Sequence, residues 1–556
     1  MKSRLILIYF SIIFVAFACT DNLDLFPKTA VSDGSFWNSE DDYELAVNSL
    51  YNTLPTRSID VDSDTQFAES DNAISSGTNL AKESEDYWND NYSRIRSSTY
   101  IIEKAKENEE VDASRYVAEA RFFRAFYYYN LLVRYGGVPI IDKVLNTDSE
   151  ELYSSRASRK ELVSFIIDDL ELAEKDLPLR SHLTSSDEIG RITKGAANAL
   201  MAKVALFEAT WSKYNGGGSD VNALLTIAKS ASKAVISSNE FELLNRYGSE
   251  SYRHLFMDPD VDDNSLGVKP EQILAKRFRE EVRTHTFAQD IQVKGSPTRK
   301  LMDMYLCVDG LPIDKSPLFK GYGGVDSEFD NRDLRMNNTV GRIGDYVWRH
   351  DGAELLVANK GFFVSTTTGY RLWKYQTEGE SRLNRKDYND QEIIRYAEVL
   401  LIYAEASYEL AGSITDSELN ESINLLRQRA EIHELSNGFV SANNLNMLEE
   451  IRRERTVELA LEGERLLDLK RWGIAVEELS KEVLGIQYDN SAWKDVTDNN
   501  GNPIKVSDLT SFGTNDDGFV IVQPKSSRTF SERNYLFPIP LQEIQLNENL
   551  TQNPNW

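Results

Sequence analysis

The segment 112–135 constrains the fold of this chain more than any other, because apolar and aromatic side chains recur there at helical spacing. The period is carried by Val117, Ala120, Phe123, Tyr127 and Leu131. Apolar residues go nearly all round this helix, which indicates burial on more than one side. Gly136, Gly137 and Pro139 follow, and residues of these types end helices. The segment therefore predicts a helix with packing partners on several faces.

The same helical spacing extends over much of the remaining chain. We expect further helices over 40–51, 158–177, 191–213, 220–238, 391–411, 416–431 and 444–472. Pro, Gly and Asn interrupt the middle of the chain every few residues and leave room only for short strands. The prediction is a mostly α protein with one folded unit, 40–556, made of helices (40–240), an irregular insert (241–390), further helices (391–475) and a loop-rich C-terminal region (476–556).

The N-terminus has the pattern of an export signal. Lys2 and Arg4 precede an apolar run that is too short to span a membrane. The run ends in Ala16-Phe17-Ala18-Cys19, which resembles a bacterial lipobox with Ala16 in place of the usual Leu. We expect residues 1–18 to be a removed signal peptide, Cys19 to be lipidated, and 19–39 to be the anchor and tether. The alternative is an ordinary signal peptide followed by a fortuitous cysteine.

Charge and cysteine content limit the classes of partner. The net charge is −27, so nucleic acid and anionic lipid are repelled. Cys307 is the only cysteine besides Cys19, which leaves no intrachain disulfide. Asp21 and Asp24, just after Cys19, resemble the acidic signals that send some lipoproteins to the cell surface, so the expected location is the outside of the cell outer membrane, held by the lipid anchor.

Catalytic and metal-binding patterns are weak. The five histidines are scattered, and no zinc, phosphate-binding or nucleophile motif is present. With 89 acidic residues, a close pair of carboxylates is no specific sign of glycosidase chemistry. Two acidic runs are spaced partly like calcium loops, Asp60-Val-Asp62-Ser-Asp64 with Asp71, and Asp258 to Asp263. We predict no catalytic residues and no cofactor or metal, with calcium at these runs as the alternative to solvated loops.

A dense run of charges lies between Glu454 and Trp472, at spacings of three and four. Such spacing places opposite charges on one helix face. The run could mark an active helix, but it favours an internal ladder of salt bridges on a packed helix.

Several distinctive motifs follow one another along the chain. They are Glu119-Ala-Arg-Phe-Phe-Arg-Ala, Arg134-Tyr-Gly-Gly-Val-Pro-Ile, Gly190-Arg-Ile-Thr-Lys-Gly, Asp309-Gly-Leu-Pro-Ile, Asn331-Arg-Asp-Leu-Arg, Ile394-Arg-Tyr-Ala-Glu-Val-Leu-Leu, Asp468-Leu-Lys-Arg-Trp and Phe537-Pro-Ile-Pro. This series resembles the SusD/RagB family of outer-membrane nutrient-binding lipoproteins of Bacteroidetes. Leu334 departs from the family, which often has Pro there.

The resemblance implies a fold and a role that periodicity alone does not give. The fold is a tetratricopeptide-like right-handed superhelix of helix pairs that supports an irregular remainder. Members are surface lipoproteins that cover a SusC-type TonB-dependent transporter and deliver oligosaccharides, or peptides in some members, to it. They are binding proteins and not enzymes.

Ligand-binding residues are expected on loops with exposed aromatic side chains, which stack on sugar rings. The first candidates are Asp71, Tyr87, Trp88 and Asn91, because a starch-binding member of the family uses a similar Trp, Asn and upstream Asp. The second are Tyr322 and Trp348, in the irregular insert. The alternative for Trp88 is that it packs at the start of its helix.

Four functions are left to weigh. Capture of a glycan for a transporter is the first, and capture of an oligopeptide is the second. A surface glycoside hydrolase would need two carboxylates about 5–10 Å apart in a cleft. A scaffold without a small ligand is the fourth.

Overall fold

The structure is a computed structural model, which describes residues 33, 36–185, 188–257, 269–342, 345–350, 353–356, 366–377, 383, 385–497 and 501–556. The longer helices are α2 (Glu40–Tyr51), α3 (Asp86–Glu107), α4 (Ser114–Tyr135), α5 (Arg159–Asp176), α6 (Lys194–Asn215), α7 (Val221–Ser238), α13 (Tyr396–Ala411) and α17 (Met447–Glu458). The shorter helices are α8 (Ser251–Met257), α9 (Phe287–Lys294), α10 (Arg299–Met304), α11 (Leu334–Thr339), α14 (Asp416–Asn420), α15 (Ile423–Arg429), α16 (Asn437–Ala442), α18 (Arg465–Arg471), α19 (Ala475–Leu479) and α20 (Leu541–Leu546).

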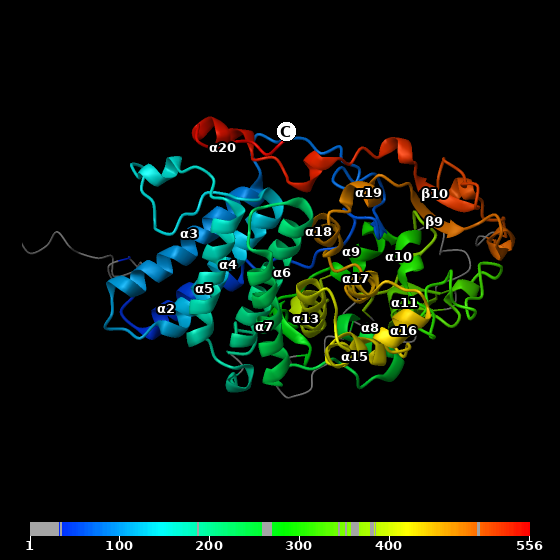
Figure 1. Ribbon diagram of the computed structural model, residues 1–556, viewed down its shortest axis with the longest axis horizontal. Coiled ribbons are helices and arrows are strands. Elements are labelled where there is room, and N and C mark those ends of the chain that lie inside the picture. The colour runs from blue at the N-terminus through cyan, green and yellow to red at the C-terminus, as the bar shows by residue number, and fades with distance from the viewer. Residues whose placement is uncertain are drawn as a thin grey trace, which may run out of the picture.

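Helices α2 to α7, with α13 beside them, form one half of the molecule (Figure 1). Each of α3 to α6 packs on the next helix in chain order, and α13 packs on α7 (Figure 1). Helix α4 lies inside this array, since Phe122 on one face and Tyr127 and Leu131 on the opposite face are all 0% exposed. The helix predicted over 112–135 is thus confirmed, as are the helices beginning near residues 40, 158, 191 and 220. None of the helices in the described part is long and apolar enough to cross a membrane.

The strands are short: β2 and β8 pack on α6, and Figure 1 places β9 and β10 beyond α18 and α19. They are β1 (Gln66–Phe67), β2 (Gln272–Lys276), β3 (Ser296–Pro297), β4 (Val340–Gly341), β5 (Tyr346–His350), β6 (Ala353–Leu356), β7 (Arg371–Leu372), β8 (Gln391–Arg395), β9 (Val483–Gln487) and β10 (Phe519–Gln523). They pair antiparallel as β1–β3, β2–β8, β4–β7, β5–β6 and β9–β10. Within the described part of 241–390 the strands are two to five residues long, as the sequence predicts.

The predicted helix over 391–411 is wrong in its first turn. Residues Gln391–Arg395 are strand β8, with Gln272 of β2 opposite Arg395, and the helix begins only at Tyr396. The two β-branched residues Ile393 and Ile394 suit a strand as well as a helix. The available partner strand β2 decides between them.

The predicted helices over 416–431 and 444–472 are each two helices. The first breaks at Ser422, whose φ of −141° and ψ of −95° are not helical. The second breaks between α17 and α18, where Leu461 and Gly463 have φ of 66° and 84°. The carboxylate of Asp60 accepts the N–H groups of Leu461, at 2.7 Å, and Arg465, at 3.2 Å. A distant residue therefore holds this turn.

The charged run that begins at Glu454 is internal, as predicted, and its charged side chains are buried except those of Glu462 and Glu464, which reach the surface in part. Glu458 is 0% exposed and contacts the guanidinium groups of Arg395, at 2.7 Å, and Arg429, at 2.5 Å. Its other oxygen lies 2.9 Å from Arg335. Further buried pairs join Glu462 to Arg395, Arg465 to Asp64 and Arg471 to Glu405. These pairs connect α17 and α18 to the insert, to α13 and to the segment before β1.

Candidate functional site

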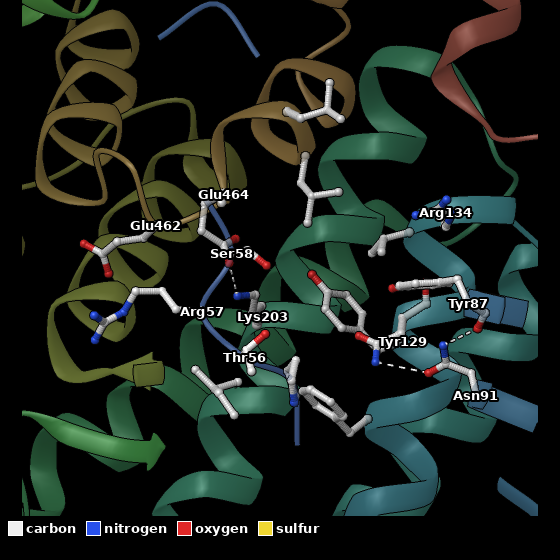
Figure 2. Close-up of a pocket in the computed structure, with 18 of the residues that line it drawn as sticks. Thr56, Arg57, Ser58, Tyr87, Asn91, Tyr129, Arg134, Lys203, Glu462 and Glu464 are labelled. Carbon is white, nitrogen blue, oxygen red and sulfur yellow. Dashed lines mark hydrogen bonds and ion pairs between the residues drawn. The ribbon is translucent and has the colours of Figure 1, made fainter. Parts of the chain in front are cut away.

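A cavity of about 530 Å³ lies where the helical half meets the segment 55–62 and the turn between α17 and α18. Figure 2 shows Tyr87, Asn91, Tyr129 and Arg134 on one side, with Arg57, Lys203, Glu462 and Glu464 on the other. The volume is within the range of small-ligand pockets, about 300–1,000 Å³. Thr56 and Ser58 at its rim are exposed, whereas Tyr129 and Lys203 deeper in are not.

Helix α3 divides the first group of predicted site residues between two surfaces. Tyr87 and Asn91 are four residues apart, share one helix face and line the cavity. Trp88 and Tyr92 share the neighbouring face and line a separate groove of about 570 Å³. Asp71 is exposed and lines neither space. The structure thus brings Tyr87 and Asn91 together and separates Trp88 and Asp71 from them.

Asn91 and Tyr87 are fixed by local contacts. The Asn91 amide donates to the carbonyl of Tyr87, at 2.6 Å, and accepts from Asn130 of α4, at 3.2 Å. The hydroxyl of Tyr87 donates to the carbonyl of Asn130, at 3.4 Å. The Tyr87 ring carries the guanidinium of Arg134, 4.4 Å from the centroid. This side of the cavity is therefore preorganised.

Trp88 is packed, being only 4% exposed. Its ring centroid lies 5.0 Å from that of Tyr92 and 5.1 Å from that of Tyr135. The groove beside it is bounded by the loop that follows α4 and by α20, and it carries the exposed side chains of Tyr153 and Leu546. Its role in ligand binding stays a prediction, and the position is that of a packed helix start.

The second predicted group lies at the other end of the molecule. Tyr322 is half-buried and contacts the rings of Phe319, at 5.3 Å, and Phe519, at 5.4 Å, both also half-buried. Arg299 donates to the hydroxyl of Tyr322 at 2.9 Å. These three rings, the aromatic trio, lie near β10, far from α3 in Figure 1.

For two predicted residues the structure describes no side-chain position. The backbone of Trp348 lies in β5, opposite Leu355 of β6, and its side chain is outside what the structure describes. Cys19 and the preceding signal sequence lie outside the described residues.

The first acidic run is not arranged as a calcium loop. Asp60 binds the turn between α17 and α18, and Asp64 binds Arg465 through both oxygens, at 2.7 and 2.8 Å. Two of its carboxylates are therefore already committed to protein donors, and Asp71 lies apart from them. No group of possible metal ligands occurs among the described residues. The second acidic run, Asp258 to Asp263, lies outside them.

Three polar residues of the cavity did not stand out as ligand-binding residues in the sequence. Tyr129 belongs to an aromatic run that reads as core, Asp62 belongs to the acidic run, and Lys470 lies in the charged run at α18. Each has sequence neighbours of the same chemical type, and only the fold shows which of them lines the cavity. No local signal distinguishes Lys470 from Arg471, which is bound to Glu405 at 2.6 Å.

Comparisons with known proteins agree along the chain. The model of the SusD family matches residues 263–556, and the model described as starch-binding associating with outer membrane matches 38–206. The SusD-like protein P38 of Formosa agariphila is 26% identical over 502 residues, covering 86% of this chain and 92% of its own. A SusD-like protein of Bacteroides ovatus is 24% identical over 527 residues, covering 89% and 86%.

Solved structures agree in fold. A SusD-like protein of Bacteroides fragilis superposes with a TM-score of 0.73 at 23% identity, over 94% of this chain and 99% of its own. A laminarin-binding SusD-like protein gives a TM-score of 0.59 at 19% identity, over 93% and 100%. The mostly helical, tetratricopeptide-like architecture expected from the resemblance is confirmed.

Proposed function

Because this chain belongs to the SusD family, we propose that it captures an oligosaccharide or polysaccharide at the outer membrane without cleaving it. In this proposal Cys19 carries the lipid anchor, the protein faces the exterior, and the glycan is delivered to a SusC-type TonB-dependent transporter. The family model described as starch-binding associating with outer membrane supports the location and the kind of ligand.

The cavity beside α3 is the observation that carries the proposal. A sugar ring has apolar C–H faces and a rim of hydroxyl groups, so its site needs aromatic or aliphatic surface beside polar atoms. The cavity supplies Phe126, Tyr129 and Leu466 as such surface, with Asn91 and Asp62 beside them. We place the ligand there, against Tyr87 and Asn91.

The aromatic trio is a second place for a long glycan. Its three half-buried rings present aromatic surface, and the carboxylate of Asp303, which is 43% exposed, supplies a hydrogen-bonding group beside them. A polysaccharide can bind both places on one chain or on two, and each added contact raises the overall affinity.

The proposal is tested by affinity electrophoresis and calorimetry on residues 20–556 against a polysaccharide panel and a set of oligopeptides. We expect one polysaccharide to retard the protein without release of new reducing ends. Tyr129→Phe, which removes a buried hydroxyl, should weaken binding about 2- to 10-fold if the cavity holds the ligand.

Tyr322→Ala tests the aromatic trio, and Phe512→Ala, at an aromatic residue that is 53% exposed, is its control. Loss of retardation in Tyr322→Ala alone would place the main site at the trio. Binding of peptides in place of glycans would replace the proposal with peptide capture. Binding of neither class would favour a scaffold. Release of reducing ends, abolished by the mutation of one carboxylate residue, would indicate a hydrolase.

A further inference from the structure

One charged side chain at the cavity has no protein partner although it is buried. Lys470 is 1% exposed and lines the cavity, and its Nζ makes no hydrogen bond or ion pair with any described residue. Nζ lies 4.8 Å from the centroid of the Phe537 ring, a contact that offsets only part of its lost hydration. Its N–H groups are therefore available to a molecule in the cavity.

Asp62 is the matching acceptor. It lines the same cavity, and its carboxylate makes no hydrogen bond or ion pair with any other residue in the described ranges. The charges of Asp62 and Lys470 attract each other, but the two groups form no ion pair. A gap between a donor and an acceptor is a binding position for a group that can both accept and donate.

The other charges of the cavity are already matched. Its described lining carries five cationic side chains (Arg57, Arg94, Arg134, Lys203 and Lys470) and five anionic ones (Asp62, Asp90, Glu392, Glu462 and Glu464). Arg57 pairs with Glu392, Arg94 with Asp90, and Lys203 with Glu464. Glu462 pairs with Arg395 and Lys374, and Arg134 with Glu85 at 3.5 Å. Only Asp62 and Lys470 are left over, as one charge of each sign.

We propose that Asp62 and Lys470 hold one hydroxyl group of a neutral sugar residue between them, with the hydroxyl donating to the carboxylate and accepting from the ammonium. This inference rests on the proposed function and names the ligand chemistry of the same cavity. A hydroxyl is the sugar group that donates and accepts at once, and it brings no charge of its own.

A charged ligand fits this pair less well. An acidic sugar would satisfy Lys470 but face the carboxylate of Asp62, and an amino sugar would satisfy Asp62 but face Lys470. The net charge of −27 adds a long-range repulsion against any polyanionic glycan. The cavity therefore selects a neutral glycan.

The pKa values of the pair give the experiment a second readout. Burial lowers the pKa of Lys470 to about 7, against the attraction of Asp62. Burial raises the pKa of Asp62 to about 6, against the attraction of Lys470. A hydroxyl that binds both charged forms makes Lys470 take up a proton and Asp62 release one, so the two nearly cancel at about pH 6.5. An acidic ligand would make both groups take up protons.

The test uses the mature chain with hexasaccharides of defined charge. The neutral probes are maltohexaose, laminarihexaose, xylohexaose and cellohexaose, and the charged probes are hexagalacturonate and the glucosamine hexamer. Calorimetry at about pH 6.5 in two buffers of different ionisation enthalpy gives both the affinity and the number of protons exchanged. We expect a neutral probe to bind best, with nearly zero net proton exchange.

Variants then assign the contact. Lys470→Met and Asp62→Asn each remove one charged partner and should weaken the neutral probe about 10- to 100-fold. The double variant should lose less affinity than the product of the two single fold losses, since both residues hold the same hydroxyl. Lys106→Met makes the same charge change at an exposed position outside the cavity and should bind as wild type does.

Each other outcome decides against the inference. Wild-type affinity in both single variants would show that the pair does not touch the ligand. Preference for a charged hexasaccharide, or net proton uptake on binding, would overturn the neutral ligand and leave glycan capture standing. Failure of every hexasaccharide to bind would overturn glycan capture at this cavity and the inference together.

Discussion

Residue type does not predict which side chains near α3 are packed in the core and which border the cavity. Trp88, a large aromatic residue, is packed between Tyr92 and Tyr135, whereas Lys470, a charged residue, is buried beside empty space. Burial of an unpaired ammonium destabilises a fold, because the charged form loses its hydration. A residue kept at such a cost is a candidate for binding, and a packed tryptophan is first of all part of the core.

Replacing Trp88 by Ala should therefore act mainly through stability. The change removes a buried indole and leaves a void, which costs about 3–5 kcal/mol of the free energy of unfolding. Tyr153→Ala, at a position 58% exposed in the same groove, should cost less than about 1 kcal/mol. Urea unfolding followed by tryptophan fluorescence and circular dichroism measures both. Equal stability of Trp88→Ala and wild type would show that the indole is not packed as described.

At the scale of elements, the turn between α17 and α18 shapes one wall of the cavity. It brings Glu462, Gly463 and Glu464 against the segment that contains Ser58. Gly463 has φ of +84°, and a Cβ there would lie 2.4 Å from the Cβ of Ser58. A glycine is thus required twice, by the backbone conformation and by the close approach of Ser58.

Gly463→Ala should destabilise the protein and distort the cavity. The left-handed conformation alone costs about 1 kcal/mol, and the contact with Ser58 forces a backbone shift that costs more. Gly218→Ala is the control, because Gly218 has φ of +77° with nothing within 4 Å of the added Cβ. The difference between the two unfolding midpoints isolates the contact. If both variants lose the same stability, the turn has room that the structure does not show.

For the molecule as a whole, buried ion pairs join the two halves. Burial alone would raise the pKa of Glu458, but the guanidinium groups of Arg429, Arg395 and Arg335 outweigh it and hold that pKa well below its usual range. Such a cluster adds little stability over apolar packing, yet losing one member leaves uncompensated charge in the core. Its effect is to fix how the helical half and the insert meet.

Glu458→Gln should lower the free energy of unfolding by about 3–5 kcal/mol at neutral pH. The exposed pair of Glu477 and Lys481 is the control, and Glu477→Gln should cost less than about 1 kcal/mol. Because the pKa of Glu458 is depressed in the folded state, its contribution is complete above the unfolded pKa of about 4.3 and is lost as pH falls through the folded value. Unfolding curves from pH 7 down into the acid range should therefore converge for Glu458→Gln and wild type only under strongly acidic conditions. Parallel curves over the whole range would contradict this assignment.

The sequence by itself determined most of the long helices, their order and the family. Apolar period, caps and stop residues are local, so α4 to α7 could be predicted within a few residues, and the ordered motifs predicted the SusD-like fold. The internal character of the charged run at α17 and α18 could also be predicted, because its spacing pairs opposite charges.

Only the tertiary structure decided where helices break and which residues face the cavity. Asp60 holds the turn at Leu461 across about 400 residues of sequence, and β2 turns Gln391–Arg395 into a strand. Tyr87 and Trp88 are adjacent in sequence yet face different spaces, and Lys470 and Arg471 differ only in their partners. A helix rotates neighbouring side chains by about 100°, and the burial and pairing of each depend on elements brought from elsewhere in the chain. Local sequence therefore determines where most helices form, and long-range packing determines which residues make up the site.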